Sequence, residues 1–197
     1  GGVGSGSVVP ILEGGTLRWN YFFDGTNLNR ANEGDQDLDF SFGGATADDP
    51  GLLGFTLRRS GEPLLGHLEP TCPGSGGMCG LFDQRDPHVF APRDPDGSLS
   101  SGSQIFWTDV STSAPTTSSI RRATFTPEDL DAMVASGSVV IPSSPLCRRP
   151  ERPSLLTRHG GGATGMQGHF LVYLCGDRVL AQRLDRVFAP PSANHEH

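Results

Sequence analysis

The chain contains 197 residues with 15 basic and 22 acidic side chains, a formal net charge of −7, and every basic residue is an arginine. The net negative charge disfavours nucleic acid and anionic membrane surfaces as partners, and the length suits a single domain. No apolar run approaches the roughly 20 residues that a membrane-spanning helix requires, so we expect no membrane span.

The two ends of the chain differ in composition from the rest. Residues 1–7 are almost entirely glycine and serine, and residues 191–197 are polar. We therefore expect a flexible lead over 1–7, a single β-rich domain over 8–190 and a disordered tail over 191–197. The 27 glycines and 16 prolines of the chain predict many turns and long loops, and they leave little room for helix.

The first predicted strand follows the Gly14-Gly15 turn. Thr16–Phe23 is rich in aromatic and other β-favouring residues, which is typical of a strand. Asp24-Gly25 comes directly after it, and this dipeptide is typical of a tight turn. The sequence therefore predicts a hairpin turn at residues 24 and 25.

Acidic and apolar residues alternate over residues 35–42, which predicts a half-buried strand. Asp35, Asp37 and Asp39 share one side of it, and their carboxylates make them a calcium candidate because calcium loops use oxygen ligands at alternate positions. An EF-hand loop starting at Asp35 would need glycine and glutamate where Phe40 and Thr46 stand. A solvated acidic strand face is the alternative, and no other cofactor is expected.

Five more segments favour strands: Gly54–Arg59, Gln104–Asp109, Ser138–Ile141, His169–Cys175 and Arg178–Phe188. One short helix is predicted over 126–136, because Thr126 can cap it, Pro127 suits its first turn and Gly137 can end it. The expected fold is mainly β: an antiparallel β-sandwich-like or related β-rich fold with one short α-helix and long loops.

Four cysteines form an even set in a loop-rich chain, which is the usage expected where disulfides persist. Three connectivities are possible, and we favour Cys72 with Cys79 and Cys147 with Cys175. A zinc site built from Cys147, His159, His169 and Cys175 is the alternative. It lacks the closely spaced cysteine pair of most structural zinc sites.

His159-Gly-Gly-Gly162 resembles the loop that supplies oxyanion-hole amides in some lipases and esterases. This resemblance implies a hydrolase with His159 or His169 as base and Asp24 or Asp109 as its partner. The Gly-x-Ser-x-Gly segment that such enzymes use to hold the nucleophile does not occur in the sequence.

Taken together, these features favour a non-enzymatic, secreted or surface-exposed β-rich module that acts in binding or as a structural subunit of a larger assembly. Long loops on a rigid β scaffold are a common arrangement for recognition. The apolar stretch Gly51–Leu68 and exposed strand edges are candidates for self-association or for binding a protein partner.

Overall fold

The computed structural model of the chain describes residues 2–13, 15–26, 40–49, 51, 54–58, 82–91, 103–111, 116–124, 138–158 and 168–184. In chain order, its strands are β1 (Gly2–Glu13), β2 (Thr16–Thr26), β3 (Phe40–Ala47), β4 (Thr56–Leu57), β5 (Phe82–Phe90), β6 (Gln104–Ser111), β7 (Thr117–Thr124), β8 (Ser138–Ile141), β9 (Pro150–Arg158), β10 (Gly168–Cys175) and β11 (Arg178–Arg183).

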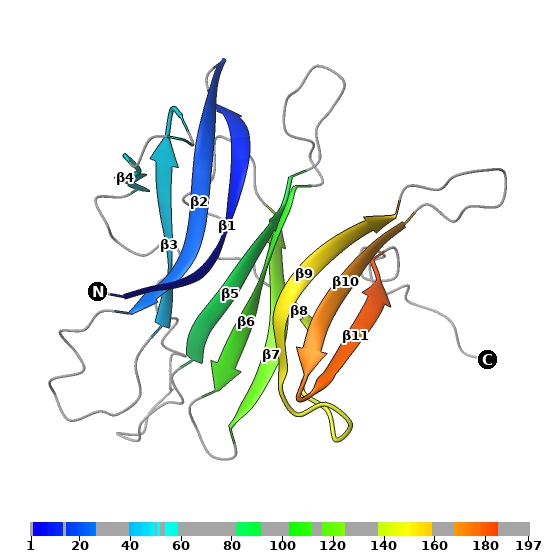
Figure 1. Ribbon diagram of the computed structural model, residues 1–197. Coiled ribbons are helices and arrows are strands. Elements are labelled where there is room, and N and C mark those ends of the chain that lie inside the picture. Colours follow the sequence, from blue (N-terminus) through cyan, green and yellow to red (C-terminus); the bar gives the residue numbers. More distant parts are fainter. Residues whose placement is uncertain are drawn as a thin grey trace, which may run out of the picture.

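The strands form three antiparallel sheets that lie side by side (Figure 1). The first sheet has the order β1-β2-β3-β4, the second β5-β6-β7-β8 and the third β11-β10-β9. The second sheet lies between the other two, and its edge strand β5 contacts β1, β2 and β3 on one side and β9 on the other. The predicted antiparallel β-rich fold is confirmed.

The second sheet is buried on both faces, because successive side chains of a strand point to opposite sides. On the face toward the first sheet, Trp107 packs in one core with Ile11 and Phe22. On the opposite face, Phe106 packs in a second core with Leu171 and other aliphatic side chains. Burial of each such large side chain contributes about 1.5–3 kcal/mol, so these two cores hold the three sheets together.

Most of the predicted strands are present. The strands predicted at 16–23, 104–109, 138–141, 169–175 and 178–188 correspond to β2, β6, β8, β10 and β11, and the segment at 54–59 contains the short β4. Residues 40–42 of the strand predicted over 35–42 begin β3, whereas 35–39 lie outside the described residues. The helix predicted over 126–136 and the tail over 191–197 also lie outside them.

Two expectations near the N-terminus are wrong. Residues 2–7, expected in a flexible lead, belong to β1 and pair with β2. Asp24 and Gly25, expected in a turn, lie within β2, where they pair with Phe42 and Ser41 of β3. The reason is that the carboxylate of Asp24 is buried and hydrogen-bonded to other strands, so a strand position satisfies it better than an exposed turn would.

Within the part of the chain that the structure describes, no helix has the length and apolar character needed to cross a membrane.

Candidate functional site

The β10–β11 hairpin forms one end of the third sheet. Its two strands are joined by a two-residue loop, Gly176-Asp177, and Cys175 pairs with Arg178 across it. Gly176 has a φ of 64°, which suits the first central position of the turn that two-residue hairpins favour. Glycine adopts this conformation without steric cost, so the local sequence explains why the chain reverses here.

One side of β11 has backbone groups that face away from β10. The amide of Leu184 donates to the carbonyl of His169 at 2.8 Å, and hydrogen-bonded pairs alternate along an antiparallel ladder. Gln182 and Leu180 therefore also bond to β10, whereas the N–H and C=O groups of Val179 and Ala181 point outward. Among the described strands, only β10 pairs with β11. We call this outward side of β11 the free edge.

The outer face of the third sheet, turned away from the second core, is apolar next to the free edge. Leu171 is fully buried in that core. Successive side chains of a strand point to opposite faces, so the residues directly before and after Leu171 in β10 lie on the outer face. The register places Val179 beside Leu174 and Ala181 beside Val172 on this face. The side chain of Val179 is 67% exposed, and Leu156 of β9, on the same face, is 59% exposed.

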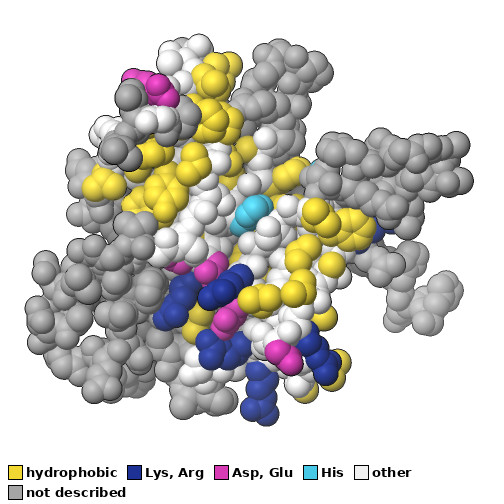
Figure 2. All heavy atoms as spheres, viewed as in Figure 1, with side chains coloured by type: hydrophobic (Ala, Val, Ile, Leu, Met, Phe, Trp, Pro, Cys, Tyr) yellow, Lys and Arg dark blue, Asp and Glu magenta, His cyan; other side chains and the backbone are white. Residues whose placement is uncertain are grey.

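Charged residues flank this apolar surface. Asp177 lies in the loop directly before β11, Arg178 begins the strand and Arg183 ends it, whereas residues 179–182 are uncharged. In Figure 2, hydrophobic side chains follow the third sheet, and arginine and acidic side chains gather toward its lower end. The free edge therefore combines outward-facing backbone groups, apolar side chains and charges at its two ends.

A disulfide fixes the turn end of the hairpin. Cys147 and Cys175 are joined, with their Cα atoms 5.6 Å apart, so the pairing we favoured for these two cysteines is present. Neither sulfur is then a thiolate that could bind zinc, which removes two ligands of the alternative zinc site. Cys72 and Cys79 lie outside the described residues.

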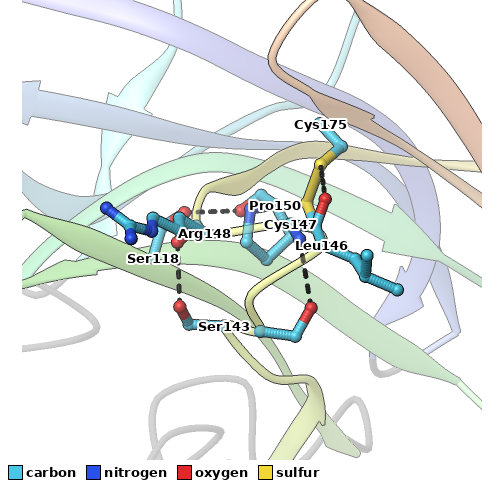
Figure 3. The surroundings of a disulfide bond; sticks show 8 residues. Ser118, Ser143, Leu146, Cys147, Arg148, Pro150 and Cys175 are labelled. Atoms are coloured by element: carbon cyan, nitrogen blue, oxygen red, sulfur yellow. Dashed lines mark hydrogen bonds between the residues drawn. A yellow bond between two sulfur atoms is a disulfide. The ribbon is translucent and has the colours of Figure 1, made fainter.

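Hydrogen bonds hold the segment that carries Cys147 (Figure 3). The amide of Cys147 donates to the carbonyl of Ser144 at 3.0 Å, and the amide of Ser144 donates back to Cys147 at 2.8 Å. Ser118 of β7 donates to the carbonyl of Pro150 at 2.8 Å, which ties the start of β9 to the second sheet. Leu146 projects from this turn and is 96% exposed.

Two similar bulges join the second and third sheets. Asp86 in β5 and Arg152 in β9 each have a φ of 54°, and a proline follows each of them. The register shifts in both places. The hydroxyl of Thr108 in β6 donates to the Asp86 carboxylate at 3.3 Å and accepts from the Arg152 amide at 3.0 Å. A single side chain thus connects both bulges.

The same network reaches the first sheet through Asp24. One oxygen of the buried Asp24 carboxylate accepts from the amide of Asp86 at 2.7 Å and from the hydroxyl of Ser5 at 2.9 Å. The other carboxylate oxygen lies against Gly4, where a Cβ atom would approach it to 2.0 Å. Asp24 therefore holds β1, β2 and β5 together.

The histidine and aspartates of the hydrolase hypothesis lie in different places. His169 packs edge-on against Phe90, with ring centroids 4.8 Å apart, and Phe90 pairs with Gln104. Asp109 lies further along β6, roughly 16 Å from Gln104 at the usual rise per residue, and it binds Arg121 at 2.8 Å. The structure therefore does not bring His169 and Asp109 together.

Asp24 does not serve as the partner of His169 either, because it lies at the Asp86 bulge, further along β5 from Phe90. His159 lies outside the described residues, as do the calcium candidates Asp35, Asp37 and Asp39.

His88 is a partly buried histidine of β5. Its Nε2 atom accepts a hydrogen bond from the amide of Leu155 in β9 at 3.1 Å, which requires the neutral ring. Burial lowers the pKa of His88 below its usual value. Its position between β5 and β9 indicates a structural role in joining the second and third sheets.

Part of the predicted self-association segment, Gly51–Leu68, is described. Phe55 and Leu57 are exposed at the edge of the first sheet, where Phe55 packs against Tyr21 with ring centroids 5.8 Å apart. Residues 52, 53 and 59–68 lie outside the described residues, so most of this prediction stays open.

Sequence reasoning missed both bulges and the strands that contain them. Asp86-Pro87 and Arg152-Pro153 are the signals that could have found them, because proline within a strand is largely restricted to edges and bulges. The free edge at β11 was expected only in the general form of exposed strand edges.

No protein-family model matches this chain, and no curated protein matches it either.

Proposed function

We propose that this chain is a non-enzymatic β-rich module, secreted or surface-exposed, that acts in binding or as a structural subunit of a larger assembly. We further propose that it associates through the free edge and the outer face of the third sheet. The observation that carries this proposal is the free edge itself, with outward backbone groups at Val179 and Ala181 and an exposed apolar face beside them.

An exposed strand edge is a template for another strand. Natural proteins usually protect such edges with prolines, inward-pointing charges or bulges. β11 contains no proline, and the bulge of the third sheet lies in β9 rather than in β11. Partners that add a strand obtain affinity from the main chain and specificity from alternate side chains, which suits the exposed Val179.

The scaffold behind the edge is cross-linked and hydrogen-bonded, and such preorganisation lowers the entropic cost of association. The Cys147–Cys175 disulfide fixes the turn end of the hairpin, and Thr108 fixes the bulge of β9. The disulfide also supports a secreted or surface location, since such bonds persist mainly in oxidising compartments.

The experiment compares Val179→Asp with Val139→Asp in cells that naturally produce the protein. Val139 is an exposed valine on β8, in a different sheet, so it is a matched control. We expect the wild-type chain and Val139→Asp to elute in a complex much heavier than the monomer, and Val179→Asp to elute as a monomer. Elution of Val179→Asp with the wild-type complex would contradict the proposal.

A further inference from the structure

The free edge has a spacing of charges that suits a second copy of the same edge. We propose, building on the function proposed above, that two copies of this chain associate through β11 in antiparallel orientation, with Leu180 of each copy on the twofold axis. The third sheets of the two copies then form one continuous six-stranded sheet, with the order β9-β10-β11 followed by its reverse.

Backbone geometry restricts the possible registers. A new antiparallel ladder forms only where the outward-facing residues of one copy lie opposite the outward-facing residues of the other. A twofold axis must therefore pass through one residue of the strand. If the axis passed between two residues, each residue whose backbone groups point outward would lie opposite a residue whose backbone groups point toward its own β10. Within the described strand Arg178–Arg183, the positions nearest the middle are Leu180 and Ala181, followed by Val179 and Gln182.

Side chains distinguish these registers. With the axis at Leu180, Val179 lies opposite Ala181 of the second copy, and Asp177 lies opposite Arg183. Both contacts occur twice because a twofold interface is made of the same patch on each copy. Opposite charges placed directly across a pair of strands stabilise the pairing. In this register each apolar side chain lies opposite an apolar one, and each Asp177 lies opposite an arginine.

The other three registers lack this match. With the axis at Val179, Asp177 of one copy lies opposite Ala181 of the other. With the axis at Ala181, Arg183 of one copy lies opposite Val179 of the other. With the axis at Gln182, Arg183 lies opposite Ala181. Each of these arrangements sets a charge against an apolar side chain and leaves Asp177 without Arg183 as its partner.

The outer face gives a second reason to expect a copy of the same chain. Val179 and Ala181 continue the apolar surface that Val172 and Leu174 begin on β10. In the proposed dimer, this surface meets its own counterpart across the axis. On the inner face, Leu180 is only partly covered next to Tyr173, and it gains Leu180 of the second copy as a neighbour.

Cysteine cross-linking tests the register. In the proposed dimer, Leu180 and its counterpart form a non-hydrogen-bonded pair with Cα atoms about 4.5 Å apart, within the range of a disulfide. The two Ala181 residues are offset along the strands by two positions, roughly 8 Å apart. We expect Leu180→Cys to form a covalent dimer under mild oxidation, with mass spectrometry placing the cross-link between the two substituted positions, and Ala181→Cys to form none.

A charge swap tests the ion pairs independently of new cysteines. Asp177→Arg and Arg183→Asp should each weaken dimerisation about tenfold at low salt, because each change places like charges opposite one another twice. The double variant Asp177→Arg/Arg183→Asp should regain most of the affinity. Arg178→Asp is the control: it changes the net charge as much as Arg183→Asp does, yet in this register it lies opposite Gln182. Sedimentation velocity over a dilution series measures each dissociation constant.

The outcomes separate this inference from the proposed function. Cross-linking of Ala181→Cys in place of Leu180→Cys, or a double swap no better than its single variants, would overturn the register proposed here. If the wild-type chain stayed monomeric while Val179→Asp still lost its place in a cellular complex, a foreign strand would occupy the edge and self-pairing would be wrong. If the Val179→Asp variant still eluted with the cellular complex, the proposed function itself would be wrong.

Discussion

The hydroxyl of Thr108 donates to the carboxylate of Asp86 at 3.3 Å, at the point where all three sheets meet. The same hydroxyl accepts from Arg152 of the third sheet at 3.0 Å, and Asp86 donates its amide to Asp24 of the first sheet at 2.7 Å. A hydrogen-bonded network of few residues therefore fixes the position of the sheet that carries the free edge.

Thr108→Val tests this network. Valine keeps the shape of threonine but removes the hydroxyl, so the Arg152 amide and the Asp86 carboxylate each lose a partner. Leaving such groups unsatisfied costs about 1–3 kcal/mol of unfolding free energy. Urea unfolding should show this loss for Thr108→Val and almost none for Thr124→Val, whose threonine is exposed at the end of β7. Equal stability of the two variants would show that the network contributes little.

Gly4→Ala tests the contact between β1 and Asp24. The new Cβ atom would lie 2.0 Å from a carboxylate oxygen of Asp24, so Asp24 or the strand must move. Such overpacking usually costs about 1–3 kcal/mol. The control is Gly54→Ala, where a Cβ atom meets nothing within 4 Å. We expect a lower thermal midpoint for Gly4→Ala alone, and similar midpoints for both variants would contradict the described fit.

His88 predicts a loss of stability in mild acid. Burial lowers its pKa in the folded protein, so below the unfolded value of about 6.5 the unfolded chain binds the proton more readily than the folded chain does. Stability therefore falls as the pH drops from about 6.5 toward the folded pKa, by at most about 1.4 kcal/mol per pH unit. Below the folded pKa, this group causes no further loss.

His88→Gln is the matched variant for this prediction, because its amide oxygen can still accept from Leu155 and does not titrate. Unfolding free energies measured from pH 8 to pH 4 should decline less steeply for His88→Gln than for the wild-type chain. Parallel pH profiles would show that another group causes the acid sensitivity.

The disulfide should stabilise the hairpin measurably. Removal of both sulfurs in Cys147→Ser/Cys175→Ser avoids a free thiol and should cost about 3 kcal/mol, mainly by freeing the unfolded chain. Denaturant unfolding without reductant measures this cost. Unchanged stability of the double variant would show that the hydrogen bonds around Ser144 and Ser118 hold this segment by themselves.

The sequence predicts the strands whose own pattern is clear. Thr16–Phe23 and Ser138–Ile141 are rich in β-favouring residues, and both are strands in the structure. β5 and β9 were missed because prolines interrupt them, and their bulges depend on partners far away in the chain, such as Thr108. The turn predicted at Asp24-Gly25 is also wrong, because the tertiary contact of Asp24 with Asp86 outweighs the turn preference of the Asp-Gly dipeptide.

The candidate surface was predictable only in part. The segment Arg178–Phe188 indicates a strand, and the cysteines indicate a cross-link, but nothing in the sequence shows that β11 lies at the edge of a sheet. Edge position depends on which strands pair with one another. The placement of the third sheet on the second depends on contacts between residues far apart in the chain, such as Phe106 and Leu171. Such long-range contacts leave no local pattern.

Amide hydrogen exchange at Val179 and Ala181 tests the association surface most directly. These amides point away from β10, whereas those of Leu180 and Gln182 bond to it in the isolated chain. The account predicts that Val179 and Ala181 exchange quickly in dilute protein and become protected in the associated state, while Leu180 and Gln182 are protected in both. Rapid exchange of Val179 and Ala181 in the associated state would contradict it.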